Sequence, residues 1–235
     1  PGNPLGSTRD VRIVAAVDRG LGLALYAAAG TPDLVALRGR VVGVDVAASG
    51  FAFAMFELLD RAGLRREDYR LAELGSTPRR LDALLEGRCA ATMLNAGSDL
   101  KADDAGLVRL ADVLSVASPY LGTVLAVQGE PSPAVRSLAA ALLEAADGIR
   151  DGTFREAAVQ EARATGLAPH LAQRYVASLL DPDHGLVPGG TADRESLSAV
   201  VDLRRRHMPQ QVADLLEGAV ETASGLVDAA SGGVR

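Results

Sequence analysis

Three consecutive units of strand, polar turn and helix between residues 41 and 106 constrain the fold of this chain more than any other feature. The predicted strands are apolar runs at residues 41–46, 69–74 and 89–94. Each is followed by small polar residues and then by apolar residues at helical spacing. Repetition of this unit requires right-handed crossovers and a largely parallel sheet. The sequence therefore predicts an α/β fold.

The predicted helices of these units begin after Ser49, near Thr77 and at Asp99, and each ends at a glycine. The rest of the chain adds shorter elements before the units and mostly helices after them. The predicted strands lie at residues 11–17, 23–28 and 122–127, and the predicted helices at 32–37, 135–147, 154–165, 169–180, 194–206 and, more weakly, 212–227.

Composition excludes several classes of function. A formal net charge of -6 and a pI near 5.1 argue against nucleic acid, which requires a basic face to neutralise phosphates. The single cysteine, Cys89, lies in an apolar run and is interpreted as a buried structural thiol. No apolar stretch approaches the roughly 20 residues that a membrane-spanning helix needs.

The histidines do not predict a metal site. His170, His184 and His207 are far apart in the sequence and lack companions at metal-ligand spacing. His184 does lie in an Asp-Pro-Asp-His-Gly segment at residues 181–185, but this composition is typical of a turn between helices. No set of nucleophile and base stands out, so no catalytic residue, metal or cofactor is assigned.

The turns that follow the three strands are the candidate binding residues. In a parallel sheet these turns meet at the carboxyl edge, where open α/β folds bind ligands, and each exposes N–H groups at a helix N-terminus. Helix capping alone would also explain Ser49, Thr77 and Ser98. The candidates from the turns are Ser49, Gly50, Phe51, Gly75, Ser76, Thr77 and Asn95.

Aromatic residues add two observations. Phe51 and Phe53 lie two residues apart at a predicted helix start, so they cannot both point into the same core, and one is expected to face the cleft. Tyr120, in a loop after a proline, is a further cleft candidate, although a surface position is the alternative.

The order of these motifs resembles the type II periplasmic binding proteins, most closely the class for nitrate, sulfonates, taurine and thiamine precursors. The resemblance lies in LRGRVVGVDV at residues 37–46, SGFA at 49–52, LGSTPRRLDAL at 74–84, AATMLN at 90–95 and PYLGTVL at 119–125. It extends more loosely over residues 11–208. Ala90 departs from the family pattern, which has an acidic residue there.

The resemblance implies a two-lobe, monomeric binding protein that holds a small molecule between its lobes and delivers it to an ABC permease in the membrane. Residues 1–36 are expected to be a remnant of the first lobe and a crossover strand, 37–120 a complete α/β lobe, and 121–235 a return strand and helices. The opening part of the first lobe is expected to be missing. Such proteins are periplasmic or are tethered outside the membrane as lipoproteins.

Two alternatives remain on the same scaffold. One is an enzyme of the thiamine-pyrimidine-synthase type, which depends on a cysteine-rich motif and a sacrificial histidine. The other is the ligand-sensing domain of a transcription regulator, which would require a DNA-binding segment. The chemical class of the ligand is open, because helix N-termini favour anions whereas the resembling family also takes neutral and nitrogen-rich compounds.

Overall fold

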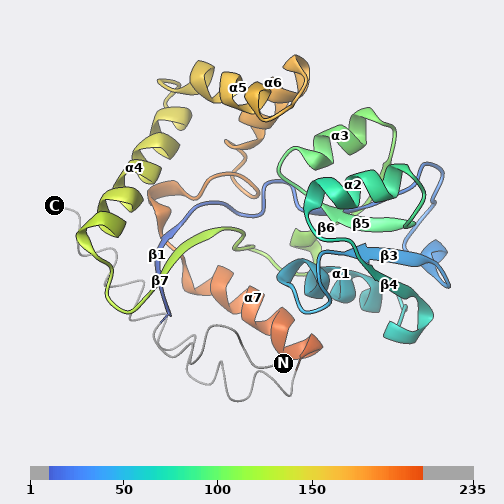
Figure 1. The fold of residues 1–235 in the computed structure, drawn as a ribbon. Coiled ribbons are helices and arrows are strands. Elements are labelled where there is room, and N and C mark those ends of the chain that lie inside the picture. Colours follow the sequence, from blue (N-terminus) through green and yellow to red (C-terminus); the bar gives the residue numbers. More distant parts are fainter. Residues whose placement is uncertain (1–10, 209–235) are drawn as a thin grey trace.

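The computed structural model describes residues 11–208, which form two β-sheets with surrounding helices (Figure 1). The larger sheet has five strands in the order β4-β3-β5-β2-β6, and the smaller sheet pairs β1 with β7. The strands in chain order are β1 (Val11–Ala16), β2 (Ala24–Ala27), β3 (Val41–Val44), β4 (Arg70–Glu73), β5 (Ala91–Leu94), β6 (Val108–Asp112) and β7 (Val124–Gln128).

The three predicted units form one side of the larger sheet, with β4 at its edge. Strand β3 pairs in parallel with β4 and with β5. Each of these strands is followed by its predicted helix, namely α1 (Gly50–Arg61), α2 (Thr77–Leu85) and α3 (Ser98–Asp104). The α/β class is therefore confirmed.

Strand β2 makes the larger sheet mixed, because it runs antiparallel to both β5 and β6. Its first residue, Ala24, pairs with Leu94 at the end of β5, since the chain enters the sheet from the carboxyl edge. Although β2 precedes the predicted boundary at residue 37, it lies inside this sheet. The division of the chain into three segments stays a prediction.

Helices cover both faces of the larger sheet. Alternate residues of a strand point to opposite faces: Leu25 of β2 packs in one apolar cluster with α1, and Tyr26 in another with α2 and α3. Gly43 in β3 is required by close packing, because a Cβ there would lie 2.8 Å from a methyl group of Leu74. Small side chains thus bring helix and sheet together, as the alanine-rich composition predicts.

The helical second half of the chain is confirmed within the described residues. Its helices are α4 (Pro133–Arg150), α5 (Arg155–Ala164), α6 (Pro169–Ser178) and α7 (Arg194–His207), whereas the predicted helix over 212–227 lies outside the described residues. The predicted helix over 32–37 is only a 3-10 turn, Val35–Leu37. Among residues 11–208, no helix is long and apolar enough to cross a membrane.

Three chain segments meet between the two sheets. Asp18 is buried, its backbone oxygen accepts a hydrogen bond from the N–H of Gly122, and it forms an isolated β-bridge with Leu186. The backbone N–H of Arg19 also donates to the carbonyl of Gly185. Gly122 is the tightest point of this junction, because a Cβ there would lie 2.1 Å from Asp18 Oδ1 and 2.5 Å from the backbone nitrogen of Gly20.

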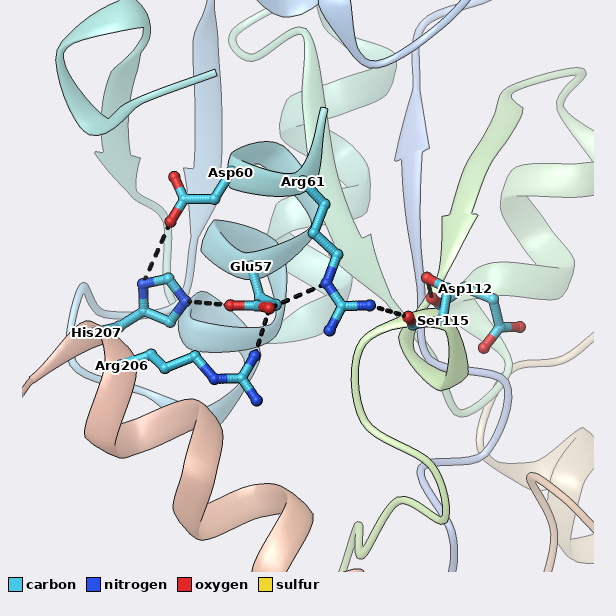
Figure 2. Close-up of polar contacts among 7 residues, drawn as sticks. All are labelled: Glu57, Asp60, Arg61, Asp112, Ser115, Arg206 and His207. Atoms are coloured by element: carbon cyan, nitrogen blue, oxygen red, sulfur yellow. Dashed lines mark hydrogen bonds and ion pairs between the residues drawn. The ribbon is translucent and has the colours of Figure 1, made fainter. Parts of the chain in front are cut away.

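A second connection between the two parts is α7, whose C-terminal end packs on α1 (Figure 2). The buried carboxylate of Glu57 on α1 accepts hydrogen bonds from Arg61 Nε at 3.0 Å and from Arg206 of α7, and it lies 3.2 Å from His207 Nε2. The His207 ring stacks on Phe53, with ring centroids 6.4 Å apart. Burial alone would raise the pKa of Glu57, but the hydrogen bond from Arg61 and the charge of Arg206 outweigh it, so this pKa lies below its ordinary value.

Replacement of Glu57 by Gln is expected to lower the free energy of unfolding at neutral pH by about 2 kcal/mol, because hydrogen bonds to a charged group are lost. A carboxyl whose pKa is depressed in the folded protein stabilises it above the unfolded pKa, near 4.5. This contribution is lost as the pH falls through the folded pKa, so the variant and the parent should converge in acid. Urea unfolding at several pH values measures both effects.

Asp60→Asn is the control, because this half-exposed carboxylate lies 3.9 Å from His207. It should lower the free energy of unfolding by less than about 1 kcal/mol.

Gly122→Ala is expected to destabilise the protein by about 3 kcal/mol, because the new methyl group overlaps Asp18 and Gly20. Gly50→Ala is the matched control, since the nearest atom to its Cβ is 3.9 Å away, and it should change stability by less than about 1 kcal/mol. Equal melting temperatures for the two variants would contradict the tight junction.

Candidate ligand-binding site

A pocket of about 480 Å³ lies at the carboxyl edge of the larger sheet, where the three turns meet. Five of the eight predicted binding residues line it, and five further residues complete the lining. The predicted residues are Phe51, Gly75, Ser76, Thr77 and Asn95, and the others are Asp45, Pro78, Arg80, Ala96 and Ser98.

The three other predicted residues lie outside the lining. Ser49 caps α1, since its hydroxyl accepts a hydrogen bond from the Ala52 N–H at 3.0 Å and donates one to Asp45. Gly50 is the first residue of α1. Tyr120 is buried, with its hydroxyl 3.9 Å from the position of a Cβ on Gly50, and burial raises the pKa of this phenol.

The N-terminus of α2 differs from that of α1. The predicted cap Thr77 is the first helical residue instead, and the hydroxyl of the N-cap Ser76 makes no capping hydrogen bond. By contrast, the Ser49 hydroxyl caps α1. The N-cap residue of α3, Gly97, offers no side chain, but its own N–H donates to the Asp99 carboxylate inside that helix. Pro78 has no N–H and the Arg80 N–H donates to the Ser76 carbonyl, so the N–H groups of Thr77 and Arg79 are the ones in the first turn without a helical partner and available to a ligand.

Arg80 supplies a buried positive charge beside this helix end. Only 1% of the residue is exposed, and its guanidinium donates to the carbonyls of Gly75 and Met93, at 2.6 and 3.1 Å, and to the Thr77 hydroxyl at 3.0 Å. Burial lowers the pKa of Arg80, with the charge of Asp45 acting in the opposite direction. The guanidinium stays protonated, because arginine in proteins does not titrate near neutral pH.

Phe51 and Asp45 give the pocket an aromatic and an acidic component. Phe53 is buried in the core, whereas Phe51 is partly exposed and lines the pocket. The Arg80 guanidinium carbon lies 5.6 Å from the centre of the Phe51 ring. The pocket therefore presents one cation, one carboxylate, an aromatic face and unpaired helix N–H groups.

The turn after β5 ties the pocket to the junction between the sheets. Asn95 Nδ2 donates to the Gly20 carbonyl at 3.1 Å, and the Ala96 N–H donates to the Leu21 carbonyl at 2.9 Å. Ala96 and Leu21 both have positive φ, of 51° and 49°. Such strain in residues other than glycine is concentrated at functional sites.

Neither Arg80 nor Asp45 is among the binding residues predicted from the sequence. A signal for Arg80 was present: it lies three residues after Thr77 and four before Leu84, so a charged residue shares a helix face with an apolar residue that is expected to be buried. Asp45 had no such signal, because an acidic residue after a strand is common and only the fold brings it near Arg80.

Neither the cysteine nor the predicted turn at residues 181–185 offers chemistry to the pocket. Cys89 is buried, as predicted, and burial raises its pKa to about 11, which keeps the thiol protonated at neutral pH. Asp181 Oδ1 accepts the backbone N–H groups of Asp183 and His184, both at 2.9 Å, which confirms a turn. In the part of the chain that the structure describes, no group of three potential metal ligands is found.

Comparison with known proteins gives structural relatives only. No protein-family model matches the sequence, and no curated protein sequence does. Solved structures do match. The periplasmic aliphatic sulphonate binding protein SsuA of Escherichia coli is 16% identical, with a TM-score of 0.67, over 89% of this chain and 71% of its own. The alkanesulfonate-binding protein SsuA of Xanthomonas axonopodis pv. citri, solved with MOPS, is 16% identical, with a TM-score of 0.68, over 87% and 70%.

The same architecture also occurs in a different kind of protein. A mutant of DszB in complex with biphenyl-2-sulfinic acid is 13% identical, with a TM-score of 0.62, over 95% of this chain and 79% of its own. At such identities the likeness establishes the fold and leaves the ligand and the activity open. This chain therefore has the fold of the type II periplasmic binding proteins, the class that its sequence motifs resemble.

Proposed function

We propose that this chain is the substrate-binding component of an ABC-type importer and captures a small organic solute in the pocket at the carboxyl edge of the larger sheet. The observation that carries the proposal is the meeting of three strand-to-helix turns around one cavity, with unpaired N–H groups on α2 beside buried Arg80. The solute-binding proteins among the structural relatives support the same role.

The polar groups of the pocket favour a ligand with an anionic end. The first turn of α2 offers N–H groups and the positive end of the helix dipole, and Arg80 adds a fixed charge that no solvent screens. A sulfonate or carboxylate suits this position. Asp45 carries the opposite charge to Arg80 and would accept hydrogen bonds from a nitrogen group on the same ligand.

Binding without catalysis is the favoured function because the pocket lining contains no cysteine, histidine or lysine. Seryl and threonyl hydroxyls are present, but a nucleophile of this type requires an adjacent base. The Thr77 hydroxyl accepts from Arg80, which is not a base. Asp45, the carboxylate of the lining, accepts from the hydroxyl of Ser49, which lies outside the lining and caps α1. The thiamine-pyrimidine-synthase alternative depends on a cysteine-rich motif, and no cysteine lines the pocket.

The resemblance extends the proposal to partners and location. As a binding component, the protein would act outside the cytoplasmic membrane, in the periplasm or tethered as a lipoprotein, and would deliver its solute to a membrane permease. Closure of the pocket would involve the junction at Asp18 and Gly122, because the Asn95 turn is bonded to the same crossing segment.

A thermal-shift screen tests the binding function directly. Alkanesulfonates, aminosulfonates, aromatic carboxylates, amines and pyrimidines are compared, because a compound that binds only the folded state raises its melting temperature. We expect a saturable shift with an anionic compound, worth about 2.7 kcal/mol at 100 times its dissociation constant. A response to none of the classes, with a cooperative melt, would contradict the proposal.

Ser76→Trp is expected to abolish the shift that the best compound produces, because the indole would fill the pocket in front of α2. Ser76 is exposed and makes no capping hydrogen bond, so the fold should persist. Ser49 is unsuitable for this test, since its replacement would remove the cap of α1. Ser137→Trp, on an exposed face of α4, is the matched control and should bind as the parent does. Equal binding by both variants would place the ligand elsewhere.

A further inference from the structure

A second cavity, of about 610 Å³, lies at the opposite end of the larger sheet from the pocket described above. It is lined by residues at the amino ends of β3, β4 and β5 and by the loop that follows β2. Cavities of this size accommodate small molecules. None of its lining residues belongs to the solute pocket, so the two sites are separate.

Arginines stand at the start of all three parallel strands. Arg40 directly precedes β3, Arg70 is the first residue of β4, and Arg88 lies three residues before β5. All three line the cavity. Because the strand order is β4-β3-β5 and neighbouring strands lie about 4.8 Å apart, their starting points form a short row with Arg40 in the middle.

This row is poorly neutralised. No acidic residue lines the cavity, and only Arg88 has an ion pair there, with Glu86 on the exposed surface. Within residues 11–208, no ion pair involves the side chains of Arg40 or Arg70. The chain as a whole is acidic, with 30 acidic and 24 basic side chains, so this local excess of positive charge is not a consequence of composition.

The shape of the cavity combines an apolar floor with a basic rim. Leu37 and Cys89 are buried at the floor, whereas the three arginines are exposed. Gly39 and Gly87 have positive φ, and a Cβ on either would meet nothing within 4 Å, so the loops leave the opening clear. The protonated, buried Cys89 thiol leaves the arginines as the only charged groups in the lining.

We propose that this cavity binds a small soluble anion with two or more negative charges, carried by phosphate or carboxylate groups. Arginine recognises both groups through paired N–H donors in a planar fork, and a bound anion would relieve the repulsion among Arg40, Arg70 and Arg88. A recess of about 610 Å³, open on one side and rimmed by arginines, suits a small molecule better than it suits a flat membrane surface. The site is independent of the solute pocket and of the proposed transport function.

Isothermal titration calorimetry of the full chain with inorganic pyrophosphate, at low ionic strength, tests this proposal. We expect saturable binding of one pyrophosphate at this site, weakening as salt is added. The double variant Arg40→Gln, Arg70→Gln should lose at least about tenfold in affinity, since each replaced arginine removes charge-assisted hydrogen bonds. Arg136→Gln combined with Arg155→Gln is the matched control, because it makes the same change in net charge at exposed positions of α4 and α5.

Two further arms identify where and in what form the anion binds. Ser76→Trp should bind pyrophosphate as the parent does. If that variant instead loses binding while the Arg40 and Arg70 double variant keeps it, the anion lies in the solute pocket and the proposal is overturned. Sedimentation with phosphatidylcholine vesicles, with and without phosphatidic acid, tests a lipid source. Retention only by acidic vesicles, without pyrophosphate binding, would overturn the assignment to a soluble ligand. An equal loss of affinity in the control double variant would overturn the assignment to this cavity.

Discussion

Parallel pairing of β3 with β4 and β5 is the constraint on which both cavities depend. Because these strands share one direction, the turns that follow them meet at the carboxyl edge, and the residues that precede them meet at the amino edge. The carboxyl edge gathers Phe51, Ser76 and Asn95 from segments that are distant in sequence. The amino edge gathers Arg40, Arg70 and Arg88 in the same way. One pairing pattern thus creates two chemically different ends.

Buried charges organise the protein at two further positions, and each is neutralised differently. Arg80 has its guanidinium surrounded by carbonyl oxygens and a hydroxyl, with the Asp45 charge nearby, so it orders the loop at Gly75 while keeping a positive charge at the pocket. Glu57 instead pairs with cations from its own helix and from α7. A buried charge left without its partners is strongly destabilising, so the contacts of Arg80 tie α2 to β5 and those of Glu57 tie α1 to α7.

The connection between the two sheets is narrow and tightly packed. Gly122 leaves no room for a side chain beside Asp18, and the Asn95 turn is bonded to the same crossing segment. A ligand in the pocket would therefore contact a turn that is directly attached to the junction. Movement of one part relative to the other would also strain α7, since it reaches α1 through Glu57 and His207.

The repeating units and their order could be predicted from the chain, because apolar periodicity and glycine positions are local properties. The sequence also predicted that the turns contribute to one site, and Ser76, Thr77 and Asn95 line the same pocket. It could not give the direction of β2, which depends on the edge at which the chain enters the sheet. Nor could it assign Ser49 to the cap of α1 while leaving α2 uncapped, since the same residue types suit either role. Two features depend on the tertiary structure: the burial of Arg80 beside Asp45, and the row of arginines at the amino edge. Charges far apart in sequence acquire their environment only when the strands pair.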